Sequence, residues 1–429
     1  MHLANLVSVF GIVVILALAW LTGGAKRRFP WRVAGWGLGL QFLFALLLLR
    51  TRGGEAVFAG ARVAVARILG FTDAGTAFLF GNLFRADAGL VQYVTPGAEG
   101  GYVQVTNAAT GELMPLGTIF AIHILPTVIF FSSLMAILYH LGVMQRLIRG
   151  IAWIMQRTMG TSGSETLSCA ANIFVGQTEA PLVVRPFIKT MTTSEIMAVM
   201  VGGFATVAGG VMAAYVRFGV DPGHLLAASV MSAPAALVVA KIMLPETEVS
   251  DTAGGVRLDV PKEYANLIDA AAGGAGVGLK LAANIGAMLL AFVALVAMVN
   301  AGLGLAGLTL EQIFGWVFAP VAWAMGVPWR EAPVFGNLLG TKIAVNEFLA
   351  YIALQDAVAA GSLSPRSVVI GTYALCGFAN FSSIAIQIGG IGGIAPERRS
   401  DVAKLGLKAM FGGALASWLT ATIAGILTM

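Results

Sequence analysis

The segment Asn172-Ile-Phe-Val-Gly-Gln-Thr-Glu179-Ala-Pro181 places a carboxylate in the middle of a long apolar stretch of this chain. The segment Lys342-Ile-Ala-Val-Asn-Glu347-Phe-Leu-Ala-Tyr351 does the same further along. Each is followed by an apolar run with a similar phrase, first Gly203-Phe-Ala-Thr206 and then Gly377-Phe-Ala-Asn380. A charged side chain at membrane depth is costly unless it faces protein or water, so by default it marks a functional site. Because the arrangement occurs twice, it predicts a transporter.

The composition predicts a protein that crosses a membrane as helices. Of the 429 residues, 58% are hydrophobic and 11% are charged, whereas roughly a quarter are charged in ordinary soluble domains. Apolar runs of about 20 residues span a bilayer as a helix. The runs here are continuous rather than alternating, which favours helices over a barrel. The net charge of +5 is small and lies mostly between the runs, so it does not indicate nucleic-acid binding.

Hydropathy predicts spans near residues 4–23, 33–49, 117–141, 194–217, 224–244, 278–301, 365–392 and 403–427. We expect the first span to be kept, because Lys26-Arg27-Arg28 follows it, whereas a cleaved signal peptide has its basic residues in front. Residues 54–83 are amphipathic and are predicted to lie in the membrane interface.

The positive-inside rule orients these spans and places both chain ends on the periplasmic face. The loop 96–116 carries no lysine or arginine and is expected on the outer face. Arg50 and Arg52 are the exception, on the outer side. The basic residues expected in the cytoplasm are Lys26, Arg27, Arg28, Arg32, Arg146, Arg149, Arg157, Arg257, Lys262, Arg398, Arg399 and Lys404.

Residues 162–190 and 330–358 carry the two glutamates, and each segment is broken at its centre by Gly, Asn, Thr, Glu or Pro. One straight span would leave unpaired backbone groups in lipid. A re-entrant hairpin avoids this, because two short helices then meet at a tip that is buried in protein. The first hairpin is expected to enter from the cytoplasm and the second from outside.

The order of hairpin, broken helix and closing helix occurs twice, over residues 162–244 and 330–427. Because the hairpins enter from opposite sides, the halves are inverted repeats, an architecture of secondary carriers that bind substrate near the midplane. The expected fold is an all-α polytopic membrane protein with inverted repeats, two re-entrant helical hairpins and two broken transmembrane helices. The breaks are expected at 203–210 and 377–383.

Five motifs resemble the signatures of the concentrative nucleoside transporters, and the resemblance runs over nearly the whole chain. They are Gly176-Gln-Thr-Glu-Ala-Pro181, Gly203-Phe-Ala-Thr206-Val-Ala-Gly209, Asn284-Ile-Gly-Ala-Met288, Asn346-Glu347-Phe348 and Cys376-Gly-Phe-Ala-Asn-Phe-Ser-Ser383. The resemblance is to the short bacterial members. It implies a homotrimer in the bacterial inner (plasma) membrane that imports nucleosides such as uridine, driven by sodium or, in some bacteria, by protons.

The resemblance also implies that each protomer has a scaffold and a transport domain that slides between the two faces of the bilayer. On this sequence the scaffold takes residues 1–160, with the first spans and the interfacial helix, and residues 246–328, with the span 278–301. The transport domain takes the two inverted repeats, 161–245 and 329–429.

The same motifs imply the residues that bind substrate and ion. Contacts to the nucleobase are implied for the first tip, at Gln177, Thr178 and Glu179. Contacts to the ribose are implied for Glu347, Asn380 and Ser383, and apolar contacts to the base for Val211 and Phe378. The implied sodium ligands are the Asn172 side chain, the Val175 carbonyl, the Thr206 hydroxyl and the Val207 carbonyl.

The chemistry of these residues suits a neutral, polar substrate. Glu347 accepts hydrogen bonds from ribose hydroxyls, Asn380 gives or accepts them, and bonds to a charged group are roughly twice as strong as neutral ones. A set of neutral oxygens favours sodium as the coupling ion. A proton-coupled carrier needs a group that titrates, and Glu179 offers one, so proton coupling stays open as the alternative.

Other functions fit the sequence less well. A hydrolase needs a nucleophile with its base or a metal cluster, whereas the two cysteines and four histidines stand apart. A channel needs a ring of pore-lining groups. A two-hairpin carrier of another small polar solute, such as an amino acid, is the nearest rival, but two buried acids repel an anionic substrate.

Single residues also have simpler interpretations. Glu179 can pair with a neighbouring helix as structural glue. The hydroxyls of Thr206 and Ser383 can bond to their own helices, as hydroxyls in membrane spans often do. Phe378 by itself is a core aromatic, and only its place in the motif makes it a candidate for the site.

Overall fold

The computed structural model describes residues 3–23, 29–85, 119–253 and 264–428, and every regular element in these ranges is a helix. The predicted all-α membrane fold is confirmed. Several sequence expectations lie outside the described residues, namely the outer loop 96–116 and the topology determinants Lys26, Arg27, Arg28, Arg257 and Lys262.

Up to the first acidic segment, the described residues form seven helices. They are α1 (Leu3–Thr22), α2 (Trp31–Arg50), α3 (Arg52–Phe80), α4 (Asn82–Arg85), α5 (Phe120–His123), α6 (Leu125–His140) and α7 (Val143–Met159). The expected interfacial segment forms α3, and this helix is also long and apolar enough to cross a membrane.

Helix α7 was not predicted, because its arginines interrupt the hydropathy pattern. Its buried residues, Met144, Ile148, Ala152, Met155 and Met159, recur at helical spacing. This period is the signal for an amphipathic helix, and it is missed when only hydropathy is averaged.

The first acidic segment and the residues after it form α8 (Gly163–Ala171), α9 (Ala180–Val183), α10 (Arg185–Ile188), α11 (Thr193–Ala205), α12 (Gly209–Arg217) and α13 (Pro222–Met243). Capping boxes start α8 at Ser162 with Glu165 and α11 at Thr192 with Glu195, which satisfies backbone N–H groups that have no partner in the helix. Backbone in the extended conformation at Thr206 and Ala208 separates α11 from α12.

Before the second acidic segment, the described residues form the α-helices α14 (Leu267–Leu303) and α15 (Leu310–Ala324). The span predicted at 278–301 begins eleven residues too late, because Asn266 caps α14 so that the helix starts at Leu267. The Asn266 side chain accepts from the N–H groups of Ile268 and Asp269. Gly274 and Gly278 let this extended part pack closely on α6. Hydropathy did not predict helix α15, which packs along α16.

The second acidic segment and its continuation form α16 (Ala332–Ala344), α17 (Glu347–Ala359), α18 (Pro365–Leu375), α19 (Phe381–Ile394) and α20 (Arg399–Leu427). The second expected break therefore exists, since α18 and α19 are separated by residues 376–380. Helices of 13 residues such as α16 and α17 are about 20 Å long, less than the roughly 30 Å of a bilayer core. Their arrangement as a re-entrant hairpin stays a prediction.

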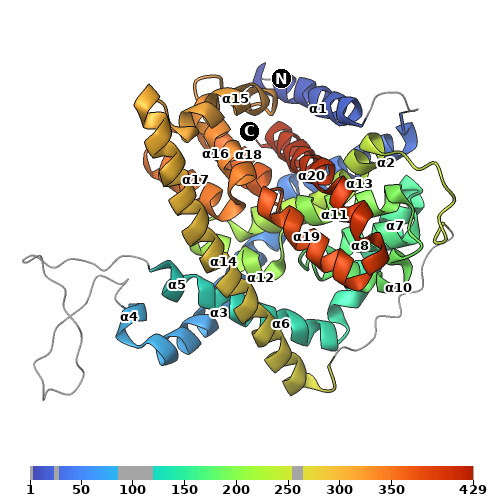
Figure 1. Cartoon of the computed structure of the whole chain (residues 1–429), viewed down its shortest axis with the longest axis horizontal. Helices are drawn as coiled ribbons and strands as arrows, with labels where there is room; N and C mark the ends of the chain where they lie inside the picture. Colours follow the sequence, from blue (N-terminus) through green and yellow to red (C-terminus); the bar gives the residue numbers. More distant parts are fainter. Residues whose placement is uncertain (1–2, 24–28, 86–118, 254–263, 429) are drawn as a thin grey trace, which may run out of the picture.

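Helices α11, α13 and α20 form the centre of the molecule (Figure 1). Of the apolar span in α13, 89% is buried inside the protein, whereas in α14 the buried share is 11%. Helix α14 lies at the edge of the molecule and packs beside α6. Arg366 bonds to the Asn5 side chain at 2.8 Å and to the Thr428 carbonyl at 3.0 Å. Both chain ends therefore lie at the same end of the molecule, as Figure 1 also shows.

Candidate functional site

The second acidic segment places its carboxylate at the start of a helix. Asn346 caps α17 by accepting from the Leu349 N–H, so Glu347 becomes the first residue of α17, where the helix dipole favours a negative charge. Glu347 is only 2% exposed. Its Oε1 accepts from the Tyr215 hydroxyl at 2.9 Å and its Oε2 from the Asn380 amide at 3.0 Å. The carboxylate is thus held by groups from two other helices.

Asn380 orients the second break around this carboxylate. It is the N-cap of α19, and its Oδ1 accepts from the Ser383 N–H at 2.9 Å and from the Ser382 hydroxyl at 2.7 Å. Because the amide oxygen caps the helix, the amide nitrogen is directed to Glu347. The cap and the contact to the carboxylate therefore depend on one side chain.

Gln177 of the first acidic segment reaches the same helix. Its Nε2 donates to the Ser383 hydroxyl at 3.1 Å, and its Oε1 accepts from Gln387 at 3.0 Å. Gln387 also donates to the Met200 carbonyl at 3.1 Å. Ser383 is therefore not merely bonded to its own helix, because it joins the first half of the protein to the second.

These bonds form one continuous path through the protein interior. It runs from Glu347 through Asn380 and Ser383 to Gln177, and all four side chains are buried. Val211 is buried in the first turn of α12, and Phe378 is half-buried in the second break. The structure thus brings four of the eight predicted substrate residues into one hydrogen-bonded set.

Thr178 and Glu179 lie elsewhere, on a cavity of about 830 Å³. The first tip, α6, α7 and α14 contribute to its walls, and Tyr139 and Arg146 are among the residues that line it. Among the described residues that line it, neither Glu347 nor Asn380 is present. Thr178 and Glu179 are therefore separate from the buried, hydrogen-bonded set of Glu347, Asn380, Ser383 and Gln177.

The four residues implied for sodium lie at the first tip and the first break. Val175 borders the cavity, as does Ala208, which follows Val207. Thr206 donates its hydroxyl proton to the Gly202 carbonyl at 2.9 Å, the back-bond expected of a hydroxyl in a membrane span, and this bond leaves the oxygen lone pairs for another partner. The simpler interpretation of Thr206 and the ion-ligand interpretation are therefore compatible.

Asn172 gives a more specific indication of a cation. Its Nδ2 donates to the Ser168 carbonyl at 3.1 Å, while its Oδ1 is buried and has no hydrogen-bond partner among the described residues. A buried polar atom without a partner costs roughly 1–3 kcal/mol, so it needs an explanation. An oxygen is the ligand type that a hard cation takes, and Asn172 fits that role.

Two residues of the site were missed by sequence reasoning. Tyr215 follows Val211 by four positions, and Gln387 follows Ser383 by four positions. Residues four apart share a helix face. Extending each motif by one helical turn would have identified both.

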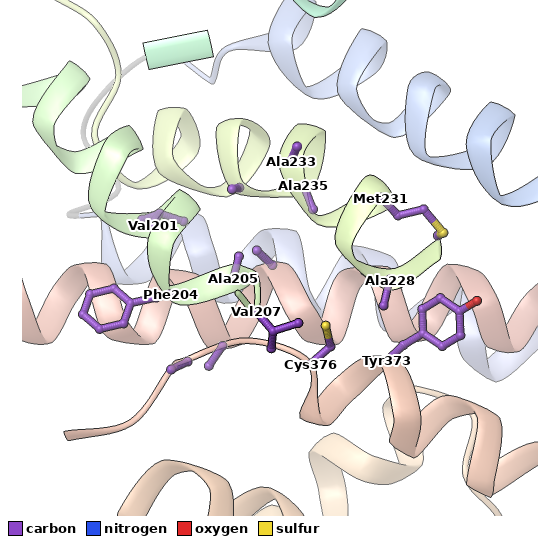
Figure 2. Close-up of a cluster of buried hydrophobic side chains, with 14 of the residues drawn as sticks. Val201, Phe204, Ala205, Val207, Ala228, Met231, Ala233, Ala235, Tyr373 and Cys376 are labelled. Atoms are coloured by element: carbon purple, nitrogen blue, oxygen red, sulfur yellow. The ribbon is translucent and has the colours of Figure 1, made fainter. Parts of the chain in front are cut away.

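The two breaks cross at the centre of the site. Figure 2 shows Val207 of the first break beside Cys376 of the second, with α13 residues such as Ala228 and Met231 around them. Gly377 has a φ of 113°, and a Cβ there would lie 2.7 Å from the Phe204 carbonyl oxygen. Only glycine fits this close crossing of two backbones.

Three family models match the chain in order. Na+ dependent nucleoside transporter N-terminus matches residues 10–83, Nucleoside recognition matches residues 121–221, and Na+ dependent nucleoside transporter C-terminus matches residues 224–425. Together they account for well over half of the sequence.

The similar proteins agree with these models. Sodium/nucleoside cotransporter 1 of Rattus norvegicus is 42% identical over 99% of this chain, which spans 64% of that relative's length. An uncharacterized transporter of Haemophilus influenzae is 44% identical over 98% of this chain and 97% of its own. The solved structure of CNTnw in an inward-facing substrate-bound state is 42% identical with a TM-score of 0.87, over 99% of this chain and 98% of that one. This chain belongs to the family of Na+-dependent nucleoside transporters, multi-pass membrane proteins that are carriers and not enzymes.

Proposed function

We propose that the chain is a secondary active symporter that imports nucleosides and is driven by sodium. The observation that carries the proposal is the buried path from Glu347 through Asn380 and Ser383 to Gln177. A carboxylate, two amides and a hydroxyl supply acceptors and donors together, as ribose hydroxyls and a base edge require. The same groups bond one another in this structure, so a substrate exchanges existing partners and leaves none unpaired.

In this proposal the second tip holds the ribose and the first tip contacts the base. Glu347 accepts from ribose hydroxyls, Asn380 and Ser383 orient them, and Val211 and Phe378 pack on the base. Thr178 and Glu179, on the cavity side, contact the base edge together with Gln177. A site built to bond a hydroxyl rejects an analogue that lacks it, so we expect 3'-deoxyuridine to bind at least about tenfold more weakly than uridine.

The coupling ion is proposed to lie between the first tip and the first break. The unpartnered Asn172 Oδ1 supports this position, and the Thr206 hydroxyl and the carbonyls of Val175 and Val207 complete the oxygen set. Sodium binding would draw α8 and α11 together at their ends. This joins the ion to Gln177, five residues after Asn172, and so to the substrate path.

Transport itself is proposed to occur by sliding of residues 161–245 and 329–429 against a scaffold of residues 1–160 and 246–328. The buried helices α11, α13 and α20 belong to the moving part, and α6 and α14 to the scaffold. The cavity lies between these two parts. The resemblance to the family also supports uridine as a substrate and a homotrimer that assembles through the scaffold. The mass of the purified complex in detergent tests the trimer.

The test is uptake of radiolabelled uridine into proteoliposomes that hold the full chain. A sodium gradient, a proton gradient and no gradient are compared. We expect concentrative uptake with sodium only. Uptake that follows the proton gradient and is lost in Glu179→Gln would instead establish the proton-coupled alternative, for which the cavity position of Glu179 is the supporting observation.

A pair of variants locates the ion. Asn172→Ala removes the proposed ligand and should raise the sodium concentration for half-maximal uptake by about tenfold, the equivalent of one charge-assisted contact. Asn300→Ala is the matched control, because Asn300 bonds Glu311 at the start of α15, outside the site. An unchanged sodium dependence in Asn172→Ala would refute the assigned ion site.

A further inference from the structure

Lys342 is the most unusual charged residue of the second half. It lies in α16 and is 0% exposed. Its Nζ donates to the carbonyls of Ala374 at 2.8 Å and Cys376 at 3.3 Å. No ion pair joins it to a carboxylate in the part of the chain that the structure describes. A buried ammonium is expensive unless it is compensated, so its surroundings must supply negative potential in another form.

Lys241, the other buried lysine among the described residues, is compensated by carboxylates in the usual way. Lys241, in α13, forms ion pairs with Glu165 at 2.7 Å and Glu246 at 3.2 Å. It also donates to the Ser194 hydroxyl. Two lysines of one protein are thus buried with different partners, carboxylates for Lys241 and backbone carbonyls for Lys342.

The carbonyls that Lys342 contacts lie at the end of a helix. Helix α18 ends at Leu375, and the last carbonyls of a helix have no partner within it and carry about half a negative charge. The Ser417 hydroxyl also donates to the Cys376 carbonyl at 2.7 Å. Lys342 therefore acts as the counter-charge for the C-terminus of α18, where the second break begins.

The first break presents the same electrostatic problem. Helix α11 ends at Ala205, and its last carbonyls lie against Gly377 of the second break. The crossing in Figure 2 thus brings two helix C-termini into one buried region. Two negative helix ends at close range repel one another unless each has a cation nearby.

The sequence supplies a lysine on one side only. Asn172-Ile-Phe-Val175 at the first tip is similar to Lys342-Ile-Ala-Val345 at the second, and the polar first position holds Asn in one phrase and Lys in the other. Lys342 places an ammonium at the second helix end. Asn172 places a buried oxygen without a hydrogen-bond partner near the first.

We propose that the Lys342 ammonium is a built-in cation of the second break and the counterpart of the exchangeable sodium of the first. The inference rests on the proposed function for the sodium. Lys342 is a positioning residue, because it bonds the backbone at the start of the second break and does not contact the substrate itself. That break contains Asn380, whose amide bonds Glu347, so the ammonium fixes the ribose side of the site while sodium occupancy controls the base side.

The test compares Lys342→Met, which keeps the length and removes the charge, with Lys342→Asn, which copies the residue of the first tip. Uridine binding by the purified full chain is measured by calorimetry over a range of sodium concentrations. The sodium dependence of thermal unfolding is measured in parallel. Lys404→Met is the control, since Lys404 is an exposed residue of α20.

We expect Lys342→Met to weaken uridine binding by about tenfold or more, as for loss of a charged hydrogen-bond partner. The sodium midpoint of the thermal shift should stay within about threefold, because the first site keeps its ligands. In Lys342→Asn, sodium should enter the second position. Uridine binding should then recover at high sodium, with a steeper sodium dependence whose Hill coefficient moves from one towards two.

Each other result counts against the proposal. Unchanged uridine affinity in Lys342→Met would show that the charge is not needed at the second break. Identical behaviour of the Met and Asn variants at every sodium concentration would show that no cation replaces the ammonium. Unfolding of both variants at all sodium concentrations would assign Lys342 to stability alone. If the unmodified chain binds no uridine, or if sodium shifts neither binding nor unfolding, the proposed function fails as well.

Discussion

The two acidic tips are alike in sequence and different in surroundings. Glu347 is 2% exposed, and both of its oxygens accept hydrogen bonds from other helices. Glu179 is only half-buried and lines a cavity of about 830 Å³ that residues of α6, α7 and α14 also line. The Glu347 carboxylate is thus enclosed by the protein, whereas Glu179 borders the cavity.

The difference arises from the residues that precede each glutamate. Asn346 caps α17 directly before Glu347, so the carboxylate sits at a helix N-terminus and its direction is fixed. At the first tip Gly176-Gln-Thr separates the end of the apolar arm from Glu179, and the next helix, α9, has four residues. We infer that Glu347 is a preorganised group that holds the ribose and that Glu179 is an adaptable group that contacts the base. Mutations at each tip test this difference.

The largest effect is expected for Glu347→Gln. The new amide would direct a donor at the Tyr215 hydroxyl or at the Asn380 amide, both of which donate to Glu347 now. Losing the charged hydrogen bonds to substrate and one of the two acceptor oxygens should weaken uridine binding by about 100-fold. Calorimetry on the purified chain measures this. Glu311→Gln is the control, because that carboxylate bonds Asn300 outside the site. A loss below threefold in Glu347→Gln would contradict a contact between Glu347 and the ribose.

A second prediction distinguishes the hydrogen bond that Tyr215 donates to Glu347 from the packing of the tyrosine ring. Tyr215→Phe deletes one donor to the carboxylate and should weaken uridine binding by about tenfold. Tyr351→Phe is matched to it, because the two rings pack with centroids 4.6 Å apart while the Tyr351 hydroxyl donates to the Thr372 carbonyl instead. Tyr351→Phe should lower the unfolding temperature without a comparable loss of affinity. Equal affinity losses would mean that both act through packing.

The sequence predicted the architecture because each part of it has a local signal. Apolar length marks the spans, and Gly203 to Gly210 and Gly377 to Ser383 mark the two breaks. Helices with other signals were missed. In α7 the apolar residues follow a helical period among arginines, and α14 begins early because Asn266 caps it.

The candidate site was predictable by residue type but not by arrangement. Gln177, Glu347, Asn380 and Ser383 were named from motifs, and the bonds between them depend on how two distant halves pack. That packing also determines that Glu179 faces a cavity and Glu347 does not, which no local pattern encodes. Tyr215 lies one helical turn after Val211 on the same face of α12, so only the helical spacing marks it, and its hydroxyl contact to Glu347 depends on the packing of the two halves.

A third and smaller effect is expected for Glu179→Gln. The side chain faces a cavity, so the amide has room to turn and to bond the base edge. We expect a loss of uridine affinity of about threefold to tenfold, measured in the same way, with sodium coupling of uptake retained. A loss as large as that of Glu347→Gln would contradict the division between a preorganised and an adaptable tip. Glu311→Gln, outside the site, is again the control for the loss of a carboxylate charge.

The smallest effect should come from Gly176→Ala, which displaces the adaptable carboxylate without removing it. A Cβ at this position would contact the Glu179 Oε2 atom and would lie 3.2 Å from the Ala208 Cβ. Because the atom in the way is the end of a flexible side chain, the carboxylate should turn further into the cavity while the backbone stays in place. We expect a change of about twofold to threefold in uridine affinity and a free energy of unfolding altered by less than about 1 kcal/mol.

Gly389→Ala provides the comparison for this last variant, since a Cβ at that position of α19 would have nothing within 4 Å. If the first tip is adaptable, the two alanine variants should unfold at similar temperatures and differ only in affinity. If Gly176→Ala instead lowers affinity as strongly as Glu347→Gln, the first tip tolerates no movement. Glu179 would then be as rigidly required as Glu347, and the cavity beside it would reflect access for the substrate rather than freedom of the carboxylate.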